Sequence, residues 1–390
     1  MAKELAFVLV NPYTISKSRT GGVLSRISSR TGLEFVAARM FAPGPDLVRA
    51  LADIARSATD IPSPGERSVL ADYVLVNFAP EARSGKRRRA LMFLFEGENA
   101  VAKVKQAVGP LRPNSESGET IRDTYGDYIV DKNGDVRYCE PAVLIGRSPE
   151  TVGKVLRLFA QYAETDGGVI DEAVDIEKGD KIQKTLVIIK PDNFRFPSSR
   201  PGNIIDIFSQ SGLRIVAAKV HRMSVAEGLE FYGPVRDFMR DKFKGMVAER
   251  ASKAFATEFA FTIPDFAKQQ IGDILGPLFG DQLFHQLIQF MTGMYVPDTS
   301  PEDQNKPGLE RCLILIYSGV NAIAKIRKLL GPTDPSKAEP GSVRKEFGQS
   351  VMINAAHASD SPENAQREML IVHPERDTIK PMVDQYYPAR

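Results

Sequence analysis

The sequence is poor in the features that would place it outside the cell or in a membrane. It has two cysteines, Cys139 and Cys312, which lie far apart in apolar stretches. Buried free thiols are therefore expected rather than a disulfide framework. No apolar run approaches the ~20 residues needed to cross a bilayer, and no signal-peptide cleavage site follows the short apolar run near the N-terminus. We expect a cytoplasmic protein that does not associate with a membrane.

Charge of one sign is also scarce. The 51 Lys and Arg residues and 49 Asp and Glu residues leave a net charge of +2, so the overall charge does not favour nucleic acid as a partner. The dense basic cluster Lys-Arg-Arg-Arg at 86–89 admits two interpretations, a solvated loop before a strand or a site that contacts an anion. A chain of 390 residues is too long for one typical domain, and two are expected.

The chain contains an internal repeat. Residues 32–39, Gly-Leu-Glu-Phe-Val-Ala-Ala-Arg, match residues 212–219, Gly-Leu-Arg-Ile-Val-Ala-Ala-Lys, at a displacement of 180. Residues 97–103 match residues 319–325 at a displacement of 222. The second copy therefore carries 42 extra residues, which fall at about 240–282.

A later match, Ser148-Pro149-Glu150 with Ser361-Pro362-Glu363, returns to a displacement of 213. The first copy therefore has nine extra residues of its own, and Asn-Gly at 133–134 between alternating apolar runs predicts a β-hairpin there.

Each copy follows the pattern strand, helix, strand, helical stretch, strand, helix, strand. In the second copy the buried apolar runs 186–189 and 313–317 predict strands, and 214–220 alternates as a strand. Apolar residues recur at helical spacing in 202–211 and 320–330. This order predicts an α+β protein of two ferredoxin-like βαββαβ domains, each an antiparallel sheet with helices on one face.

One histidine lies among small and polar residues, in the segment Asn-Ala-Ala-His-Ala-Ser-Asp-Ser at 354–361. This residue, His357, is followed eleven residues later by Glu368, and a nucleophile with an orienting carboxylate is the arrangement that covalent catalysis needs. A lone loop histidine usually has no chemical role, so the assignment depends on other residues. Transfer of a phosphoryl group needs cations and hydrogen-bond donors, which are supplied by Lys190, Arg327, Arg344, Tyr232 and Thr333.

On these residues the second half resembles nucleoside diphosphate kinase. Residues 186–192 resemble the family's first strand and its phosphate-binding lysine, residues 327–344 its arginine, threonine, arginine set, and residues 354–363 its catalytic loop. The resemblance implies ping-pong transfer of the terminal phosphate from a nucleoside triphosphate to a nucleoside diphosphate through a phosphohistidine at His357. It implies Lys190 and Glu368 as further catalytic residues, and Mg²⁺ that arrives on the nucleotide phosphates without a protein metal site.

The resemblance also implies a substrate-binding set, with two departures. Ala358 stands where the family usually has Gly, and the 42-residue insert lies near the helical hairpin that offers a base-stacking side chain. Alignment places Leu283 at that position, Phe284 beside it and Val351 on the other face of the base. The whole set is Lys190, Tyr232, Leu283, Phe284, Arg327, Thr333, Arg344, Val351, Asn354 and Ser359.

The first half resembles the same family without its chemistry. Asn11 occupies the lysine position, Lys105 the first arginine position and Leu144 the histidine position, and only Arg122 is retained. We interpret this half as a structural or regulatory pseudo-domain, with a repurposed nucleotide-sensing site as the alternative. The expected division is a degenerate domain at 1–164, a linker at 165–182, an active domain at 183–374 and a tail at 375–390.

Two other functions remain open at this point. The inactive first copy and the basic run at 86–89 would also suit a non-catalytic nucleotide- or RNA-binding scaffold of two ferredoxin-like modules. An oligomerising platform with vestigial activity is the third. Since members of the family self-associate, the resemblance implies a pseudo-dimer within each chain, and a trimer of chains as the further assembly.

Overall fold

The computed structural model describes residues 3–112, 118–173 and 182–388. The chain divides into two compact units. The first consists of Met1–His221, Leu313–Met369 and His373–Arg390, and it contains almost all of the two four-stranded sheets, one from each copy of the repeat. The second consists of Arg222–Cys312 and Leu370–Val372, and it is helical.

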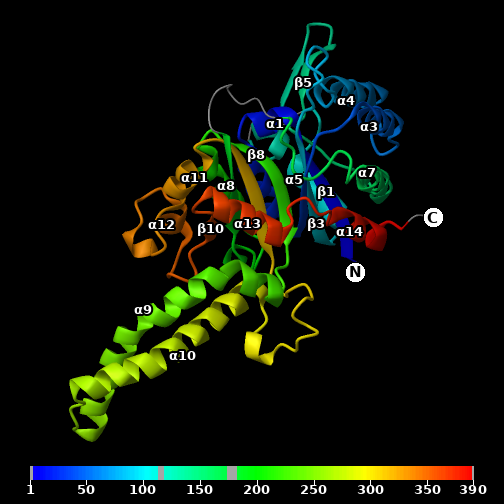
Figure 1. Ribbon diagram of the computed structural model, residues 1–390. Helices are drawn as coiled ribbons and strands as arrows, with labels where there is room; N and C mark the ends of the chain where they lie inside the picture. Colours follow the sequence, from blue (N-terminus) through cyan, green and yellow to red (C-terminus); the bar gives the residue numbers. More distant parts are fainter. Residues whose placement is uncertain (1–2, 113–117, 174–181, 389–390) are drawn as a thin grey trace. The chain divides into compact units, whose positions relative to one another are not determined.

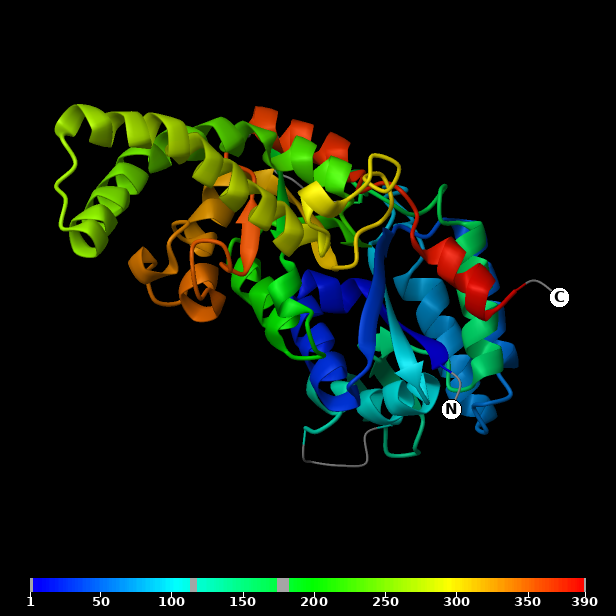
Figure 2. The same ribbon diagram turned by 90° about the horizontal axis from the view of Figure 1, so that it is seen from below.

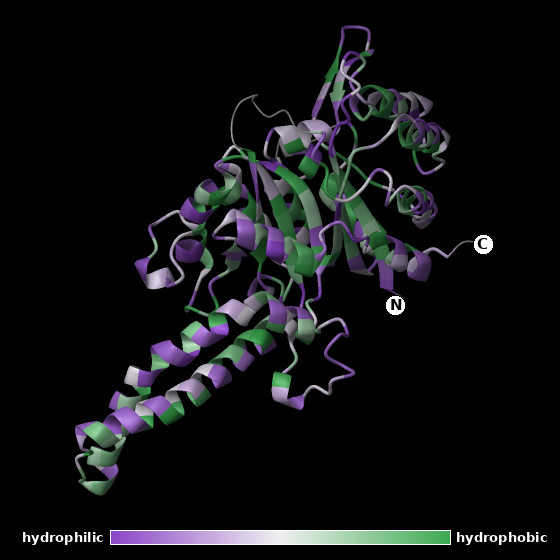
Figure 3. Ribbon diagram, viewed as in Figure 1, coloured by the Kyte–Doolittle hydropathy of each residue, from purple (hydrophilic) through white to green (hydrophobic). Residues whose placement is uncertain are grey.

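The first copy forms a four-stranded antiparallel sheet in the order β2-β3-β1-β6. Its strands are β1 (Lys3–Val10), β2 (Glu34–Phe41), β3 (Ala90–Glu98) and β6 (Val143–Leu144). Helices α2 (Thr20–Thr31) and α5 (Ala100–Val108) pack against each other, and α5 packs against β1. Central strands such as β1 are buried over most of their length, and Figure 3 shows them as hydrophobic.

The second copy forms a sheet in the equivalent order β10-β7-β9-β8. Its strands are β7 (Ile182–Ile189), β8 (Arg214–His221), β9 (Cys312–Val320) and β10 (Ala356–Ala358), with helices α8 (Arg200–Ser209) and α11 (Ala322–Leu330) (Figure 1). We number the four sheet strands of each copy in chain order and leave out the β4–β5 hairpin. Read from one edge to the other, both sheets then have the order fourth, first, third, second. The predicted pair of ferredoxin-like domains is confirmed.

The repeat extends to individual backbone angles. Asn99 and Asn321, which precede α5 and α11, both adopt left-handed backbone at φ 54°. Gly97 and Gly319 have φ 158° and 152°, and a Cβ on either would lie 2.6–2.7 Å from a leucine side chain. Because Asn321 is the N-cap, α11 begins at Ala322, two residues after the start predicted from periodicity.

The two copies pack on each other through equivalent elements inside the first unit. Helix α2 packs on α8, and strand β2 lies beside β8. The helices approach closely because both have a glycine at the contact, and a Cβ on Gly202 would lie 2.2 Å from the Gly21 carbonyl oxygen. Ser25 Oγ donates a 2.9 Å hydrogen bond to the Ser199 carbonyl across the same contact. Buried residues of both copies belong to one continuous hydrophobic cluster.

The extra residues of the first copy form the predicted hairpin. Strands β4 (Asp127–Val130) and β5 (Val136–Glu140) pair antiparallel, and Gly134 in their turn has φ 88°. Neither cysteine forms a disulfide, as predicted; Cys312 is buried, whereas Cys139 is only partly buried. Of the predicted linker at 165–182, only residues 165–173 and 182 lie among the described residues. Within it, Asp166 is 5% exposed and accepts a 2.8 Å hydrogen bond from Gly44 N.

The helical unit is a long antiparallel hairpin of α9 (Val225–Phe259) and α10 (Asp265–Thr292), which run side by side in Figures 1 and 2. Helix α9 begins at a capping box between Ser224 and Glu227. On α10, Gly272, Gly276 and Gly280 let the helices touch, because a Cβ at any of them would lie about 2.7 Å or less from α9 backbone. The residues predicted as an insert, about 240–282, fall entirely within this hairpin.

The remaining helices and strands connect these elements. Among the described residues no helix is both long and apolar enough to span a bilayer. The connecting helices are α1 (Pro12–Ser16), α3 (Pro45–Ser57), α4 (Pro64–Asn77), α6 (Ile121–Tyr125), α7 (Pro149–Gln161), α12 (Val343–Phe347), α13 (Pro362–Val372) and α14 (Ile379–Tyr386), with short 3₁₀ turns at Pro191–Asn193, Val296–Asp298 and Pro335–Lys337.

Candidate active site

His357 lies on the short strand β10, where it pairs with Ile188 of β7. Its side chain is 22% exposed, and its Nε2 lies 3.1 Å from Glu368 Oε2. Glu368 projects from α13, is almost fully buried, and accepts a 2.6 Å hydrogen bond from Ser359 Oγ. A buried carboxylate held by a hydroxyl can fix the orientation of the ring and stabilise its charged form.

Local sequence explains how these three residues meet. Ala355 adopts left-handed backbone at φ 68°, which turns the chain into β10. Three residues after the strand, Ser361 caps α13 by accepting a 3.0 Å hydrogen bond from Asn364 N, and Pro362 occupies the first helical position. The helix then carries Glu368 back to the strand that it follows.

Lys190 directly follows β7 and is 5% exposed. Its Nζ donates hydrogen bonds of 2.7 Å to Asn354 Oδ1 and 3.4 Å to the Met352 carbonyl. Burial is the main reason that the pKa of Lys190 falls to about 7, with the positive charge of Arg344 adding to the effect. An anion that approaches this ammonium would therefore stabilise its charged form.

Arg344, on α12, ties together three segments of the second copy. Its guanidinium donates hydrogen bonds of 3.0 Å to the Gly331 carbonyl and 3.2 Å to the Ala356 carbonyl, one residue before His357. The retained Arg122 of the first copy donates in the same way to the Gly109 and Val143 carbonyls. Since Arg122 makes these bonds where the histidine is missing, one role of this arginine in both copies is to hold the loops.

Asn354 connects the lysine to the loops on the other side. While its Oδ1 accepts from Lys190, its Nδ2 donates to the Thr333 carbonyl at 3.2 Å and the Val351 carbonyl at 2.8 Å. The Thr333 side chain is exposed, and Val351 is 57% exposed. The hydrogen bonds of Asn354 are thus made inside the protein, whereas the predicted ligand-binding residues Thr333 and Val351 are exposed to solvent.

The structure places the predicted residues in two groups. The helical unit carries Tyr232, Leu283 and Phe284. Phe284 is 1% exposed beneath the Arg236 guanidinium, while Leu283 is partly exposed. Tyr232 is 6% exposed and packs against Phe231. The first unit carries the remaining predicted residues, Lys190, Arg327, Thr333, Arg344, Val351, Asn354, His357, Ser359 and Glu368.

Two buried polar residues beside Lys190 were not predicted. Asn193 Nδ2 donates to the Lys190 carbonyl at 3.1 Å and to the Ala355 carbonyl at 2.9 Å, and so ties the lysine to the histidine loop. The Asp192 carboxyl lies 3.8 Å from Arg200, and burial raises its pKa. Their position directly after Lys190-Pro191 was the available sequence signal.

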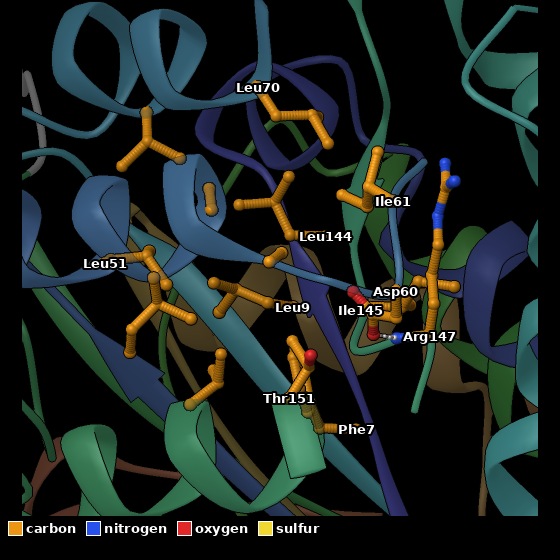
Figure 4. A pocket seen from close by; sticks show the side chains of 15 residues that line it. Phe7, Leu9, Leu51, Asp60, Ile61, Leu70, Leu144, Ile145, Arg147 and Thr151 are labelled. Carbon is orange, nitrogen blue, oxygen red and sulfur yellow. Dashed lines mark hydrogen bonds between the residues drawn. The ribbon is translucent and has the colours of Figure 1, made fainter. Parts of the chain in front are cut away.

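The equivalent place in the first copy is apolar. Leu144 pairs with Leu9 on β1, as His357 pairs with Ile188 on β7, so the register confirms Leu144 as the counterpart of the histidine. Leu144 lines a cavity of about 50 Å³ together with side chains of α3 and α4 (Figure 4). Asn11, at the lysine position, is buried and donates to Glu140 Oε1 at 3.1 Å. The first copy thus has an amide hydrogen-bonded to a carboxyl group where the second copy has Lys190, and a leucine where the second copy has His357.

The chain is similar to known proteins over about half of its length. The nucleoside diphosphate kinase family model matches residues 260–378. The nucleoside diphosphate kinase of Campylobacter hominis is 31% identical over 188 residues, which are 48% of this chain and 93% of that protein. The nucleoside diphosphate kinase of Bdellovibrio bacteriovorus is 30% identical over 190 residues, 49% of this chain and 92% of that protein.

Solved structures of the same kind are similar to half of the chain. One is the Aquifex aeolicus nucleoside diphosphate kinase, at 24% identity, with 51% of this chain and 98% of that chain covered and a TM-score of 0.31. Another is an NDP kinase from Pyrobaculum aerophilum, at 28% identity, 49% and 94% coverage and a TM-score of 0.33.

The chain belongs to the nucleoside diphosphate kinase family. Each relative spans about half of it, which agrees with the two copies read from sequence and backbone. The match of the family model begins at residue 260 and includes the arginine, threonine, histidine and glutamate positions of the second copy.

Proposed function

We propose that this chain is a nucleoside diphosphate kinase with its active site in the second copy and His357 as the phosphorylated nucleophile. The observation that carries the proposal is the series Ser359, Glu368, His357, in which a buried carboxylate is held by a hydroxyl and lies 3.1 Å from the ring. Lys190 N donates to the Ala355 carbonyl, and Arg344 to that of Ala356, so both cations adjoin the same loop.

The contact with Glu368 selects the reacting atom. Because Nε2 faces the carboxylate, Nδ1 is the nitrogen proposed to attack the terminal phosphorus of a nucleoside triphosphate. An N–P bond forms from its lone pair while the bond from that phosphorus to the bridging oxygen breaks, and the nucleoside diphosphate leaves. As Nδ1 becomes positive, Glu368 stabilises the proton on Nε2. A terminal oxygen of a second diphosphate then attacks the phosphohistidine and reverses these steps.

Positive side chains would hold the phosphate oxygens during transfer. Arg327 and Arg344 supply positive charge, Lys190 becomes fully charged as the phosphates bind, and Tyr232 and Thr333 supply hydrogen-bond donors. Preorganised groups of this kind contribute roughly 3–4 kcal/mol each to such transition states. Mg²⁺ is proposed to enter bound to the phosphates of the nucleotide, as part of the substrate.

The base would be contacted less specifically. Val351 is exposed, and Leu283 is the partly exposed member of the pair Leu283 and Phe284, so the two residues that the alignment suggested stay the proposed apolar contacts. Phe284 would have to leave its buried position to stack. We also propose that the chain is divided into a degenerate domain, a linker, an active domain and a tail. The proposed further assembly is a trimer of chains.

Labelling with γ-³²P nucleoside triphosphate tests the assignment. We expect the full chain to take up label that is labile to acid and stable to base, and His357→Asn to take up none. The matched control is His373→Asn, since His373 Nδ1 lies 3.1 Å from Glu375 Oε1 in another His–carboxylate pair. Equal uptake by the His357 variant would refute the proposal. Nucleotide binding without any label in the wild type would instead favour a non-catalytic scaffold.

A further inference from the structure

A basic cleft of about 370 Å³ lies in the first unit and has no part in the proposed phosphate transfer. Five of its lining residues are the cluster 86–89 and Arg214, and the acidic residue among the described residues that line it is Glu81. Tyr13 and Asn77 also line it. The volume lies within the range of small-molecule sites, about 300–1,000 Å³. The cleft therefore has the size and the charge of an anion site.

Two of the arginines are already bound to the protein, with different consequences for charge. Arg87 Nη1 lies 3.2 Å from the carboxylate of the nearly buried Asp166, so its charge is neutralised. Arg88 donates to the Val76 and Asn77 carbonyls at 3.0 and 3.3 Å, at the C-terminal end of α4. Carbonyl dipoles orient this guanidinium but leave it with its full positive charge.

Arg89 and Arg214 place like charges together. The Arg89 guanidinium donates to the Ile215 carbonyl, beside Arg214 on β8. The pKa of Arg89 is lowered to about 10, by burial first and by the charge of Arg214 second. Among the described residues neither guanidinium is ion-paired with a carboxylate. Like charges in a partly buried place are unfavourable until an anion lies between or beside them.

The repeat shows that this charge arrangement is special to the cleft. The counterpart of Arg214 in the first copy is Glu34, and the counterpart of Arg89 in the second copy is Arg311. The residues equivalent to Arg214 and Arg89, which are Glu34 and Arg311, thus have opposite charges. Residues 86–88 align with Gly-Leu-Glu at 308–310, which has no base. Duplication of the fold therefore does not account for the positive charge, which has been added to one side.

We propose that this cleft binds a small polyphosphate anion at a site separate from the one around His357. Asp166 neutralises Arg87, whereas Arg88, Arg89 and Arg214 form no ion pair with a carboxylate among the described residues. Three such charges suit a chain of two or three phosphates. The planar forks of arginine bind phosphate oxygens in pairs. Inorganic polyphosphate and nucleoside polyphosphates both contain such a phosphate chain. Titration with one compound of each kind distinguishes them.

Calorimetric titration of the full chain with inorganic tripolyphosphate, and separately with ATP, counts the sites. The wild type should show two sites per chain. Arg214→Glu places a carboxylate beside Arg89, as Glu34 does at the equivalent place of the first copy, and should remove one site without lowering the melting temperature. Lys190→Met should remove the other. Arg30→Glu, on the exposed end of α2, makes the same charge change outside the cleft and should keep both.

The outcomes separate this proposal from the proposed function. The proposed cleft site would be overturned if Arg214→Glu kept two binding sites. It would also be overturned if the wild type had a single site that only Lys190→Met removed. A single site lost in Arg214→Glu and kept in Lys190→Met would support the cleft and contradict nucleotide binding near His357. Orthophosphate binding as tightly as tripolyphosphate would also overturn a polyphosphate site. At the Arg214-dependent site, equal affinity for both probes identifies the phosphate chain as the ligand, and at least tenfold tighter ATP identifies a nucleotide. Phosphate transfer by Arg214→Glu should be unchanged.

Discussion

Lys190 should make the folded protein more stable as the pH rises from 7 to 9. Its pKa is about 7 in the folded chain against an ordinary value of 10.5. Between these values the unfolded chain holds a proton that the folded chain has released, so the free energy of unfolding increases with pH. The contribution is most unfavourable at and below pH 7, and it is recovered as the pH approaches 10.5. With these two pKa values, linkage gives an increase of about 2 kcal/mol between pH 7 and pH 9.

Urea unfolding of the full chain without nucleotide, at both pH values, measures this effect. Lys190→Met keeps the length and apolar stem of the side chain and removes the charge. The difference between wild type and variant in their pH dependence isolates the lysine, because other titrating groups are common to both. Lys325→Met, on the exposed face of α11, is the matched control and should follow the wild type.

The reasoning is refuted if the increase in unfolding free energy from pH 7 to pH 9 differs by less than about 0.5 kcal/mol between wild type and Lys190→Met. A lysine that is ionised equally in the folded and unfolded states does not make stability depend on pH. Such a result would mean that the ammonium of Lys190 stays solvated in the folded protein. The contacts with Asn354 and Met352 would then not reflect a buried charge.

Four other results are expected. Binding of a nucleoside diphosphate at pH 8 should take up a proton at Lys190, seen as a dependence of the calorimetric heat on buffer ionisation enthalpy and absent in Lys190→Met. Glu368→Gln should lower kcat about 10²-fold but still form phosphohistidine, since the carboxylate stabilises charge and does not react; a loss as large as that of His357→Ala would contradict this. Arg122→Met should cost about 3 kcal/mol of stability by leaving buried carbonyls unpaired, while turnover per folded chain stays within twofold. A fragment of residues 182–390 should aggregate or self-associate in light scattering, because α8 and β8 lose their cover; a stable, active monomer would show that the first copy is not needed as a cover.

The repeat, the strand order and the histidine–glutamate pair could all be read from the sequence. Periodicity decides which residues form strands and helices, because side chains alternate along a strand and recur every 3.6 residues in a helix. The displacement between copies located the extra hairpin of the first copy, and pairing of Leu9 with Leu144 agrees with that alignment. The positions of Glu368 and Ser359 followed from the resemblance, and packing brought them to His357.

Other properties depend on contacts between distant segments. The 42-residue insert could be counted, but its form as an extension of two helices rests on glycines of α10 meeting the backbone of α9. The second role of Arg344, holding carbonyls of two loops, appears only when its counterpart Arg122 is seen to do the same.

The sequence by itself determined the family, the duplication and the absence of the lysine and the histidine from their positions in the first copy, because these depend on residue identity and spacing. Tertiary structure alone decided the charge state of Lys190 and joined residues 86–89 to Arg214 in one cleft. The physical reason is that a pKa and an electrostatic field depend on burial and on every nearby charge. Arg344 lies 154 residues after Lys190, and Arg214 lies 125 residues after Arg89, and no local pattern in the chain can specify such contacts.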